Sequence, residues 1–381
     1  MAHIYFDHNA TTALDEQVLQ AMLPFMSAQQ GNATSRHAYG RAARYAIEQA
    51  REQVANAVGA YPSQVILTAS GTEANNFAVN GITAKQPNTQ IVISAIEHPC
   101  VTRPAEMLQS RGYTLTKIGV NAQGELDVAS LENALKRPTS LVSVMLANNE
   151  TGAIQAVTQM AELAKKHGAY SHTDAVQAFG KIPVDFSALN VHAMTISSHK
   201  IHGPLGAGAL ILDKRVDISA FMLGGGQEKG LRSGTENVAA IVGFGLASEL
   251  AVKKLASNAE KTQQLRAQLE LGLHRLGATI FSEQAKRLPN TSFFAFNNIE
   301  GETLVMALDR KAFAVASGSA CSSDSTEPSH VLLSMAIAPD LARGAIRVSL
   351  DASNSSEQIA QFLVVLEQEL IRLKQMLAIA A

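Results

Sequence analysis

Cysteine is scarce in this sequence, which has Cys100 and Cys321 among its 381 residues. Two cysteines cannot build the dense disulfide framework that stabilises small secreted domains. They favour a reducing compartment instead, in which a thiol stays available for chemistry.

The sequence also lacks an excess of charge of either sign. Lys and Arg together number 31 and Asp and Glu together number 33, which gives a formal net charge of −2. This near balance provides no overall field that would attract nucleic acid or an anionic membrane surface. We therefore expect no direct nucleic-acid partner and no membrane partner.

Targeting and membrane segments are missing as well. The first residues, Met1–Asp7, contain no basic region followed by an apolar run, so we expect no signal peptide. The uncharged window Val54–Thr72 is interrupted by Pro62 and polar residues, and no run reaches the roughly 18 apolar residues of a membrane span. We expect a soluble, cytoplasmic protein.

The length and the hydrophobic pattern predict an α/β protein. The 381 residues exceed the roughly 250–300 that one hydrophobic core usually supports, so we expect two domains. Short apolar runs that alternate with helical patterns predict a mostly parallel sheet covered by helices. The expected strands are Val65–Thr68, Ile91–Ser94, Leu141–Leu146, Ala193–Ser197 and Gly208–Leu212. The expected helices between them are Glu73–Ala84, Val101–Gln109, Leu131–Arg137 and Thr158–His167.

The pattern changes after the glycine-rich stretch Gly224–Gly230. A long helix from Val238 to Leu276 precedes expected strands at Thr291–Phe296, Phe313–Ala316 and Ala345–Leu350, and expected helices at Glu302–Leu308 and Glu357–Leu377. We predict a large domain of residues 14–260 and a smaller α+β domain of residues 1–13 and 261–381.

Two residues at strand ends are candidates for catalysis. Lys200 follows the apolar strand and lies within Ser197–Pro204, where a buried amine with a lowered pKa can form a Schiff base. Asp174 ends another short strand, and a carboxylate there can pair with the ring nitrogen of pyridoxal phosphate (PLP). A surface lysine and a helix N-cap are the alternative interpretations.

Two loop motifs are candidates for binding. Ser70-Gly71-Thr72 connects a strand to a helix, and the free amides of such a helix end can bind phosphate or simply be capped. His98 lies in a loop after a strand, where its ring can cover a flat cofactor and move protons, or be merely solvated.

Cys321 and Arg347 complete the candidates. Cys321 lies among small polar residues, which is typical of an accessible loop, so its thiol is the candidate nucleophile. Cys100 opens an expected helix, and we interpret it as structural. Arg347 lies within an apolar strand, where it can bind the carboxylate of an amino acid or form an internal salt bridge.

In this order, the motifs resemble the cysteine desulfurases of the NifS/IscS type, which belong to the class V group of PLP-dependent enzymes. The resemblance runs nearly end to end, with Ala13 where the family often has proline. The matching segments are Phe6–Thr12, Gly31-Asn32, Ser35–His37, Ser70–Glu73, Glu97-His98, Asn148–Gly152, Asp174–Gln177, Ser198–Lys200, Arg232–Thr235 and Ser317–Cys321.

The resemblance implies the PLP-dependent transferase fold of type I and a role for each matched residue. Lys200 would bond to PLP, Asp174 would pair with the ring nitrogen, and His98 would stack on the ring. Gln177 and Asn149 would contact the ring oxygen or the substrate, and Asn149 and Arg347 would hold the substrate carboxylate. The phosphate would be held by Gly71, Thr72, Ser197, His199 and, from the second subunit of a homodimer, Thr235.

The implied reaction converts L-cysteine to L-alanine and leaves a persulfide on Cys321, with Lys200 or His98 moving protons. The persulfide would pass to an acceptor protein, for iron–sulfur cluster assembly or for thio-modification of a cofactor or nucleic acid. One alternative is a selenocysteine or cysteine-conjugate lyase on the same fold. Another is a sulfur-relay or scaffold subunit without catalysis of its own. A nicotinamide dehydrogenase is not expected, because no Gly-x-Gly-x-x-Gly follows the first strand.

Overall fold

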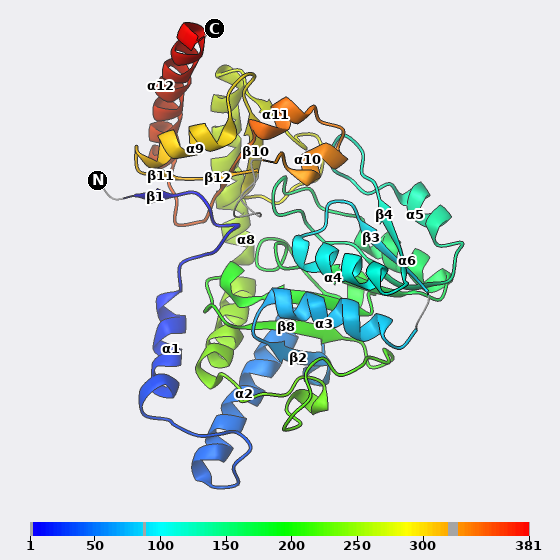
Figure 1. The fold of residues 1–381 in the computed structure, drawn as a ribbon. Helices are drawn as coiled ribbons and strands as arrows, with labels where there is room; N and C mark the ends of the chain where they lie inside the picture. Colours follow the sequence, from blue (N-terminus) through cyan, green and yellow to red (C-terminus); the bar gives the residue numbers. More distant parts are fainter. Residues whose placement is uncertain (1–2, 87–88, 319–326, 381) are drawn as a thin grey trace.

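A seven-stranded sheet organises the larger part of the molecule. The computed structural model describes residues 3–86, 89–318 and 327–380 (Figure 1). The strands, in spatial order, are β2 (Val65–Thr68), β8 (Gly208–Leu212), β7 (Ala193–Ser197), β6 (Tyr170–Asp174), β5 (Thr139–Ser143), β3 (Gln90–Ser94) and β4 (Thr114–Ile118). Strand β8 is antiparallel to both neighbours, whereas β7, β6, β5, β3 and β4 pair in parallel.

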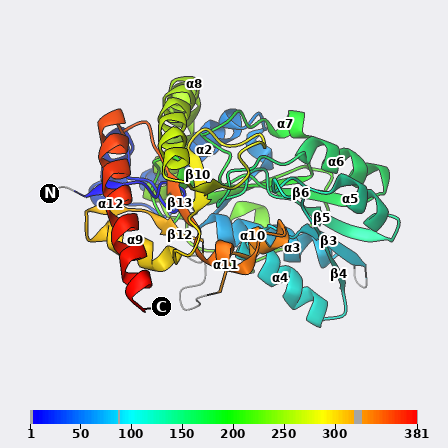
Figure 2. The same ribbon diagram turned by 90° about the horizontal axis from the view of Figure 1, so that it is seen from above.

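Both faces of this sheet are buried along β2, β8, β7, β5 and β3, whose residues are all buried, whereas the edge strand β4 is partly exposed. Successive side chains of a strand point to opposite faces, and Val92 and Ile93 accordingly belong to different hydrophobic clusters. Figure 2 shows α3 and α4 on one side of the sheet and α5 and α6 on the other. These helices are α3 (Gly71–Thr83), α4 (Pro99–Ser110), α5 (Val128–Ala134) and α6 (Val157–Lys166).

The helix α8 (Val238–Arg275) runs past both parts of the molecule. Its first half packs Phe244 and Ala247 into the cluster on the large sheet, next to α1 (Glu16–Ser27) and α2 (Ala38–Ala57). Its second half packs Leu265, Leu269 and Leu273 into a separate cluster. Residue 260 lies inside this helix, so the division of the chain at that residue stays a prediction.

A smaller antiparallel sheet carries the C-terminal part. Its order is β12 (Ala316–Ser317), β13 (Ile346–Ser349), β10 (Thr291–Ala295) and β9 (Thr279–Ile280). Beside it, β1 (Ile4–Tyr5) pairs in parallel with β11 (Phe313–Ala314), so the N-terminal residues lie with the C-terminal ones. The remaining helices are α7 (Phe186–Leu189), α9 (Gly301–Asp309), α10 (His330–Ser334), α11 (Pro339–Arg343) and α12 (Ser356–Ala380).

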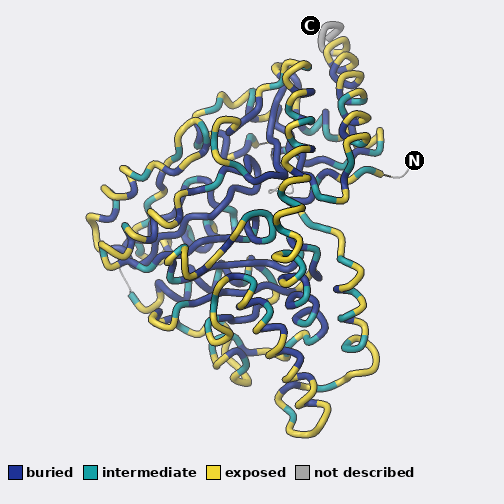
Figure 3. The backbone as a smooth tube through the Cα atoms, turned by 180° about the vertical axis from the view of Figure 1, so that it is seen from behind, coloured by how far each residue is buried: buried dark blue, intermediate teal, exposed yellow. Residues whose placement is uncertain are grey.

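Burial follows this layered arrangement. Figure 3 shows buried backbone concentrated in the strands and exposed backbone along the outer helices. Across the described ranges, no helix is both long enough and apolar enough to cross a membrane.

Candidate active site

The carboxyl ends of neighbouring strands bring the predicted site residues together. Asp174 ends β6, Ser197 ends β7, and Lys200 lies in the 3₁₀ turn Ser198–Lys200 that follows. His98 and Asn149 lie in the loops after β3 and β5. In open α/β sheets this edge is where ligands bind.

These residues surround one cavity of about 250 Å³. Nine of the predicted residues line it, namely Gly71, Thr72, His98, Asn149, Asp174, Gln177, Ser197, His199 and Lys200. Sequence reasoning missed Asn75 and Met145 in the lining. Asn75 follows Gly71 by one helical turn, and that spacing is a signal that could have identified it.

Asp174 is buried and held on both carboxylate oxygens. Its Oδ1 accepts a hydrogen bond from the Val176 amide at 2.9 Å, and its Oδ2 accepts one from Asn75 Nδ2 at 2.7 Å. Burial nevertheless raises the pKa of Asp174, against the hydrogen bonds and the nearby His98 and Lys200. A cation placed against this carboxylate would offset the cost of burying its charge.

His98 caps the N-terminus of α4, and its ring contacts Cys100. The His98 Nδ1 accepts from the Cys100 amide at 3.2 Å and lies 2.9 Å from Cys100 Sγ. Burial lowers the pKa of His98. The prediction that Cys100 opens a helix is confirmed, since α4 begins at Pro99 and the thiol is buried.

The helix end at α3 forms one wall of the cavity. Ser70 caps α3 through a bond from the Glu73 amide to Ser70 Oγ at 3.1 Å, so the helix end is capped by Ser70 and not by Thr72. A side chain at Gly71 would come within 2.9 Å of Val176 Cγ2 and 3.3 Å of Ser197 Cβ, so only glycine leaves this wall open. Buried Ser197 Oγ has no hydrogen-bond partner among the described residues. The first amides of a helix together with an unpaired hydroxyl suit a phosphate group.

His199 lies beside this wall. Its Nδ1 contacts Thr11 Oγ1 at 3.2 Å, and burial together with the charge of Lys200 lowers the pKa of His199 to about 4. The ring is therefore neutral at pH 7.

Lys200 reaches back to the N-terminal segment. Its Nζ donates to the backbone oxygens of Asn9 and Ala10, both at 2.6 Å. Its side chain lines the cavity. This position favours the interpretation of Lys200 as a site residue over that of a surface lysine.

Arg347 lies next to the cavity on β13. Its Nη2 pairs with Asp7 Oδ1 at 2.6 Å, and its Nη1 donates to the backbone oxygen of Asn149 at 2.9 Å. The internal salt bridge that the sequence left open is thus present. Nε remains a buried donor for which the described part of the chain offers no acceptor.

Two predicted residues lie elsewhere. Thr235 is exposed in the stretch before α8 and does not line the cavity of its own chain. Cys321 lies outside the described residues. The chain on either side of it is anchored near the site, because β12 pairs Ala316 with Arg347, and the His330 ring contacts the Glu97 oxygen at 3.1 Å.

Comparison with known proteins assigns the family. Residues 4–362 match the family model described as Aminotransferase class-V. The chain belongs to this family. A cysteine desulfurase IscS of Dictyoglomus turgidum is 39% identical over 375 residues, which cover 97% of this chain and 95% of that protein. The cysteine desulfurase NifS of Azotobacter vinelandii is 40% identical over 363 residues, or 94% of this chain and 90% of that protein.

Solved structures of class-V relatives share the fold. A NifS-like protein superposes with a TM-score of 0.91 at 37% identity, over 97% of this chain and 99% of that one. A structure described as SspA in complex with cysteine superposes with a TM-score of 0.82 at 31% identity, over 92% and 99%. Cysteine desulfurases of the class-V family are PLP-dependent enzymes, and the predicted fold, enzyme class and cofactor are confirmed for this chain.

The cavity of this class-V enzyme fits PLP by its own chemistry. The Asp174 carboxylate offers a buried partner for a protonated ring nitrogen, and Ser197 Oγ with the α3 amides offers donors for the phosphate. Lys200 lines the same cavity and offers an amine for the aldehyde. The cavity therefore holds a suitable group for each of the three functional groups of the cofactor.

Proposed function

We propose that the protein is a cysteine desulfurase that converts L-cysteine to L-alanine and carries the sulfur as a persulfide on Cys321. The observation that carries this proposal is the convergence of Lys200, Asp174 and His98 on one cavity. The full-length relatives named cysteine desulfurase support the substrate, and they do not favour the lyase alternative. When bound, PLP supplies an electron sink for the substrate carbons.

Each side chain then has a defined task. Lys200 would hold the cofactor through Nζ and would accept or return protons at that atom. Asp174 holds the ring nitrogen, and neutral His98 covers the ring and moves protons. Gly71, Thr72, Ser197 and His199 hold the phosphate. Asn149 and Gln177 contact the ring oxygen or substrate.

Arg347 is proposed to bind the substrate carboxylate. Its guanidinium is already oriented by Asp7 and by the Asn149 oxygen, and its remaining donors include the unpaired Nε. A planar guanidinium held in this way binds a carboxylate with little loss of side-chain freedom.

The structure of Cys100 supports Cys321 as the sulfur-carrying residue. Burial, together with the nearby Asp174 carboxylate, raises the pKa of the Cys100 thiol far above its ordinary value. A thiol is a poor nucleophile until it becomes a thiolate. Because the sequence contains two cysteines, the nucleophile is proposed to be Cys321.

The sulfur transfer balances without an added oxidant or reductant. The Cys321 thiolate attacks the sulfur of L-cysteine, a sulfur–sulfur bond forms, and the bond between that sulfur and the substrate β-carbon breaks. The electron pair stays with the substrate carbon skeleton, which takes up a proton and leaves as L-alanine.

We propose further that the enzyme acts as a homodimer in the cytoplasm. Thr235 lies on the exposed surface of its own chain, so the phosphate contact assigned to it requires a second subunit. A reducing compartment keeps the Cys321 thiol free to react with the substrate sulfur. The persulfide acceptor is proposed to be a protein, either an iron–sulfur scaffold or another sulfur carrier.

The decisive experiment follows the persulfide. Wild-type enzyme loaded with PLP and given L-cysteine should produce L-alanine in step with persulfide on Cys321, measured by mass spectrometry after alkylation. Cys321→Ala should bind PLP but form no persulfide, whereas the matched variant Cys100→Ala should still form it. After reduction with borohydride, the wild-type peptide that contains residue 200 should carry PLP covalently, and the same peptide of Lys200→Ala should not. Undiminished sulfide release by Cys321→Ala would refute the proposal.

A further inference from the structure

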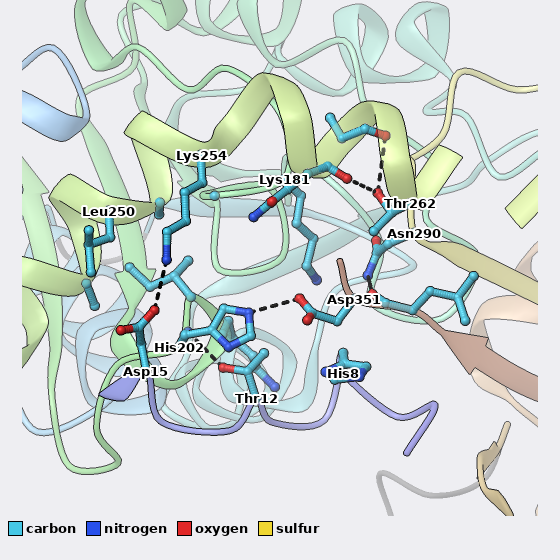
Figure 4. Close-up of a pocket in the computed structure, with 18 of the residues that line it drawn as sticks. His8, Thr12, Asp15, Lys181, His202, Leu250, Lys254, Thr262, Asn290 and Asp351 are labelled. Carbon is cyan, nitrogen blue, oxygen red and sulfur yellow. Dashed lines mark hydrogen bonds and ion pairs between the residues drawn. The ribbon is translucent and has the colours of Figure 1, made fainter. Parts of the chain in front are cut away.

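A second cavity, of about 60 Å³, lies on the other side of Lys200. Lys200 lines both cavities, and the second one also contains Lys181, Lys254, His202 and Asp351 (Figure 4). Lys254 and His202 form ion pairs with Asp15 and Asp351, and thus belong to ordinary salt bridges. Lys181 differs from them in its partners.

Lys181 donates to two side-chain amide oxygens. Its Nζ lies 2.7 Å from Asn9 Oδ1 and 2.8 Å from Gln177 Oε1. Burial of the amine, and repulsion from Lys200 and Arg347, lower the pKa of Lys181 well below its usual range. A lysine in such surroundings is costly for the folded state, and costly buried groups are concentrated at functional sites.

The contact with Lys181 determines which way the Gln177 amide faces. Lys181 Nζ donates to Gln177 Oε1, so the oxygen of the Gln177 amide faces Lys181. The amide nitrogen, Nε2, then points away and donates to the Asn9 backbone oxygen at 2.9 Å. Nε2 carries a second N–H, and Gln177 lines the cofactor cavity.

The same Asn9 backbone oxygen accepts from Lys200 Nζ. Lys181 and Lys200 are thus both bound to Asn9, one through the side chain and one through the main chain. The side-chain amide of Asn9 is fixed in turn, since Nδ2 donates to the Asn149 oxygen at 3.1 Å and to Thr291 Oγ1 at 2.9 Å.

We infer that Lys181 is a positioning residue, which holds the Gln177 amide with its N–H group toward the cofactor so that it donates to the anionic ring oxygen of PLP. This inference rests on the proposed function, since it requires PLP in the first cavity. Without Lys181, only the bond from Nε2 to the Asn9 backbone oxygen orients the amide. Rotation that turns the Gln177 oxygen toward the ring oxygen then replaces an attraction by a repulsion.

The test measures binding of PLP to the apoenzyme. Lys181→Met should raise the dissociation constant of PLP about tenfold, the size expected for a lost hydrogen bond to a charged group. The apoenzyme of Lys181→Met should stay folded, as its melting temperature will show, because the cost of burying the amine is removed together with its two hydrogen bonds. Lys181→Arg, which keeps a donor, should restore part of the affinity. Lys254→Met, a lysine of the same cavity, is the matched control and should bind PLP as the wild type does.

A double-mutant cycle tests whether the effect passes through Gln177. Lys181→Met should weaken PLP binding no further when it is combined with Gln177→Leu. The inference would be overturned if the double variant lost PLP affinity by the product of the two single-variant factors. It would also be overturned if a folded Lys181→Met protein bound PLP as tightly as the wild type. If Lys181→Met does not fold, Lys181→Gln takes its place in the cycle. Wild-type protein that fails to bind PLP would instead refute the proposed function itself.

Discussion

Asn75 donates through Nδ2 to Asp174 Oδ2 at 2.7 Å, and the same nitrogen lies 3.0 Å from Cys100 Sγ. Asn75 is fully buried and carries no charge. It therefore stabilises the ionised form of Asp174 without neutralising it, which keeps the carboxylate available for a cofactor cation.

Replacement of Asn75 by alanine should weaken cofactor binding. Burial already raises the pKa of Asp174, and loss of the Asn75 bond should raise it further, so less of the carboxylate is ionised. We expect the dissociation constant of PLP to rise about tenfold or more, as measured by titration of the apoenzyme. Asn80→Ala, on the same helix but bonded to the Asn76 oxygen, is the control. Equal PLP affinity in the Asn75 and Asn80 variants would contradict this role.

Arg347→Lys should affect the substrate more than the cofactor. A lysine can keep one ionic contact with Asp7, but it loses the planar fork that binds a carboxylate through two hydrogen bonds. The KM for L-cysteine should rise about tenfold or more, with little change in PLP affinity. Arg343→Lys, whose partner is the exposed Asp340, should leave KM unchanged. A fall in kcat at constant KM would argue against carboxylate binding.

The sequence predicted β2, β3, β7 and β8 because apolar runs mark them. Strand β5 (Thr139–Ser143) begins two residues and ends three residues before its predicted bounds, and β4 received no prediction. Strands β2, β7 and β8 have the predicted bounds, and α8 ends one residue before the predicted Leu276. Helices α1 and α2 received no prediction. Helix α2 has a low mean hydropathy, and small residues such as Ala43, Ala50 and Gly40 form much of its buried side. Small residues bury little apolar area, so no group of large apolar residues marks this helix in the sequence.

The candidate site was predictable where it depends on strand ends, and unpredictable where it depends on distant contacts. Lys200 follows an apolar run and Asp174 ends a short strand, so both could be identified locally. The partners of Asn9 could not, because Gln177, Asn149 and Thr291 are separated from it by 140 residues or more. Lys181 likewise looks like an ordinary surface lysine in the sequence. Its burial follows from how the N-terminal segment and α8 close around it.

His202 and Asp351 should make the stability of the protein depend on pH. The His202 Nδ1 donates to the Ala13 oxygen and Nε2 to Asp351 Oδ2, both at 2.9 Å, so the ring is doubly protonated. Burial opposes this charge, but the Asp351 carboxylate outweighs it and raises the pKa of His202. His202 in turn lowers the pKa of Asp351.

The direction of this pH dependence follows from the difference between the pKa of each group in the folded and in the unfolded protein. The contribution of His202 is full below the pKa of an unfolded histidine, about 6.5, and is lost as pH rises through the raised value. That of Asp351 is full above about pH 4 and is lost as pH falls through the lowered value. Asp351→Asn should therefore reduce the melting temperature by roughly 1–3 °C near pH 6 and by less near pH 9. Asp213→Asn, whose partner Arg215 does not titrate, should show the same effect at both pH values. A larger effect of Asp351→Asn at pH 9 would refute the pairing.

Glu228→Gln should destabilise the fold beside the active site. Glu228 is buried and accepts from both terminal nitrogens of Arg51 at 2.7 Å and from the Leu67 amide of β2 at 2.8 Å. The change removes the buried carboxylate and leaves the Arg51 guanidinium with the half-exposed Glu48 as its remaining acidic partner, which should lower the free energy of unfolding by about 3 kcal/mol in urea titrations. Replacement of both residues by methionine should recover part of that loss, since no unpaired charge remains. Asp340→Asn, in an exposed pair with Arg343, should cost about 0.5 kcal/mol or less. If Glu228→Gln were no worse than this control, the pair would not hold the start of β2 and the loop Glu228–Gly230 together.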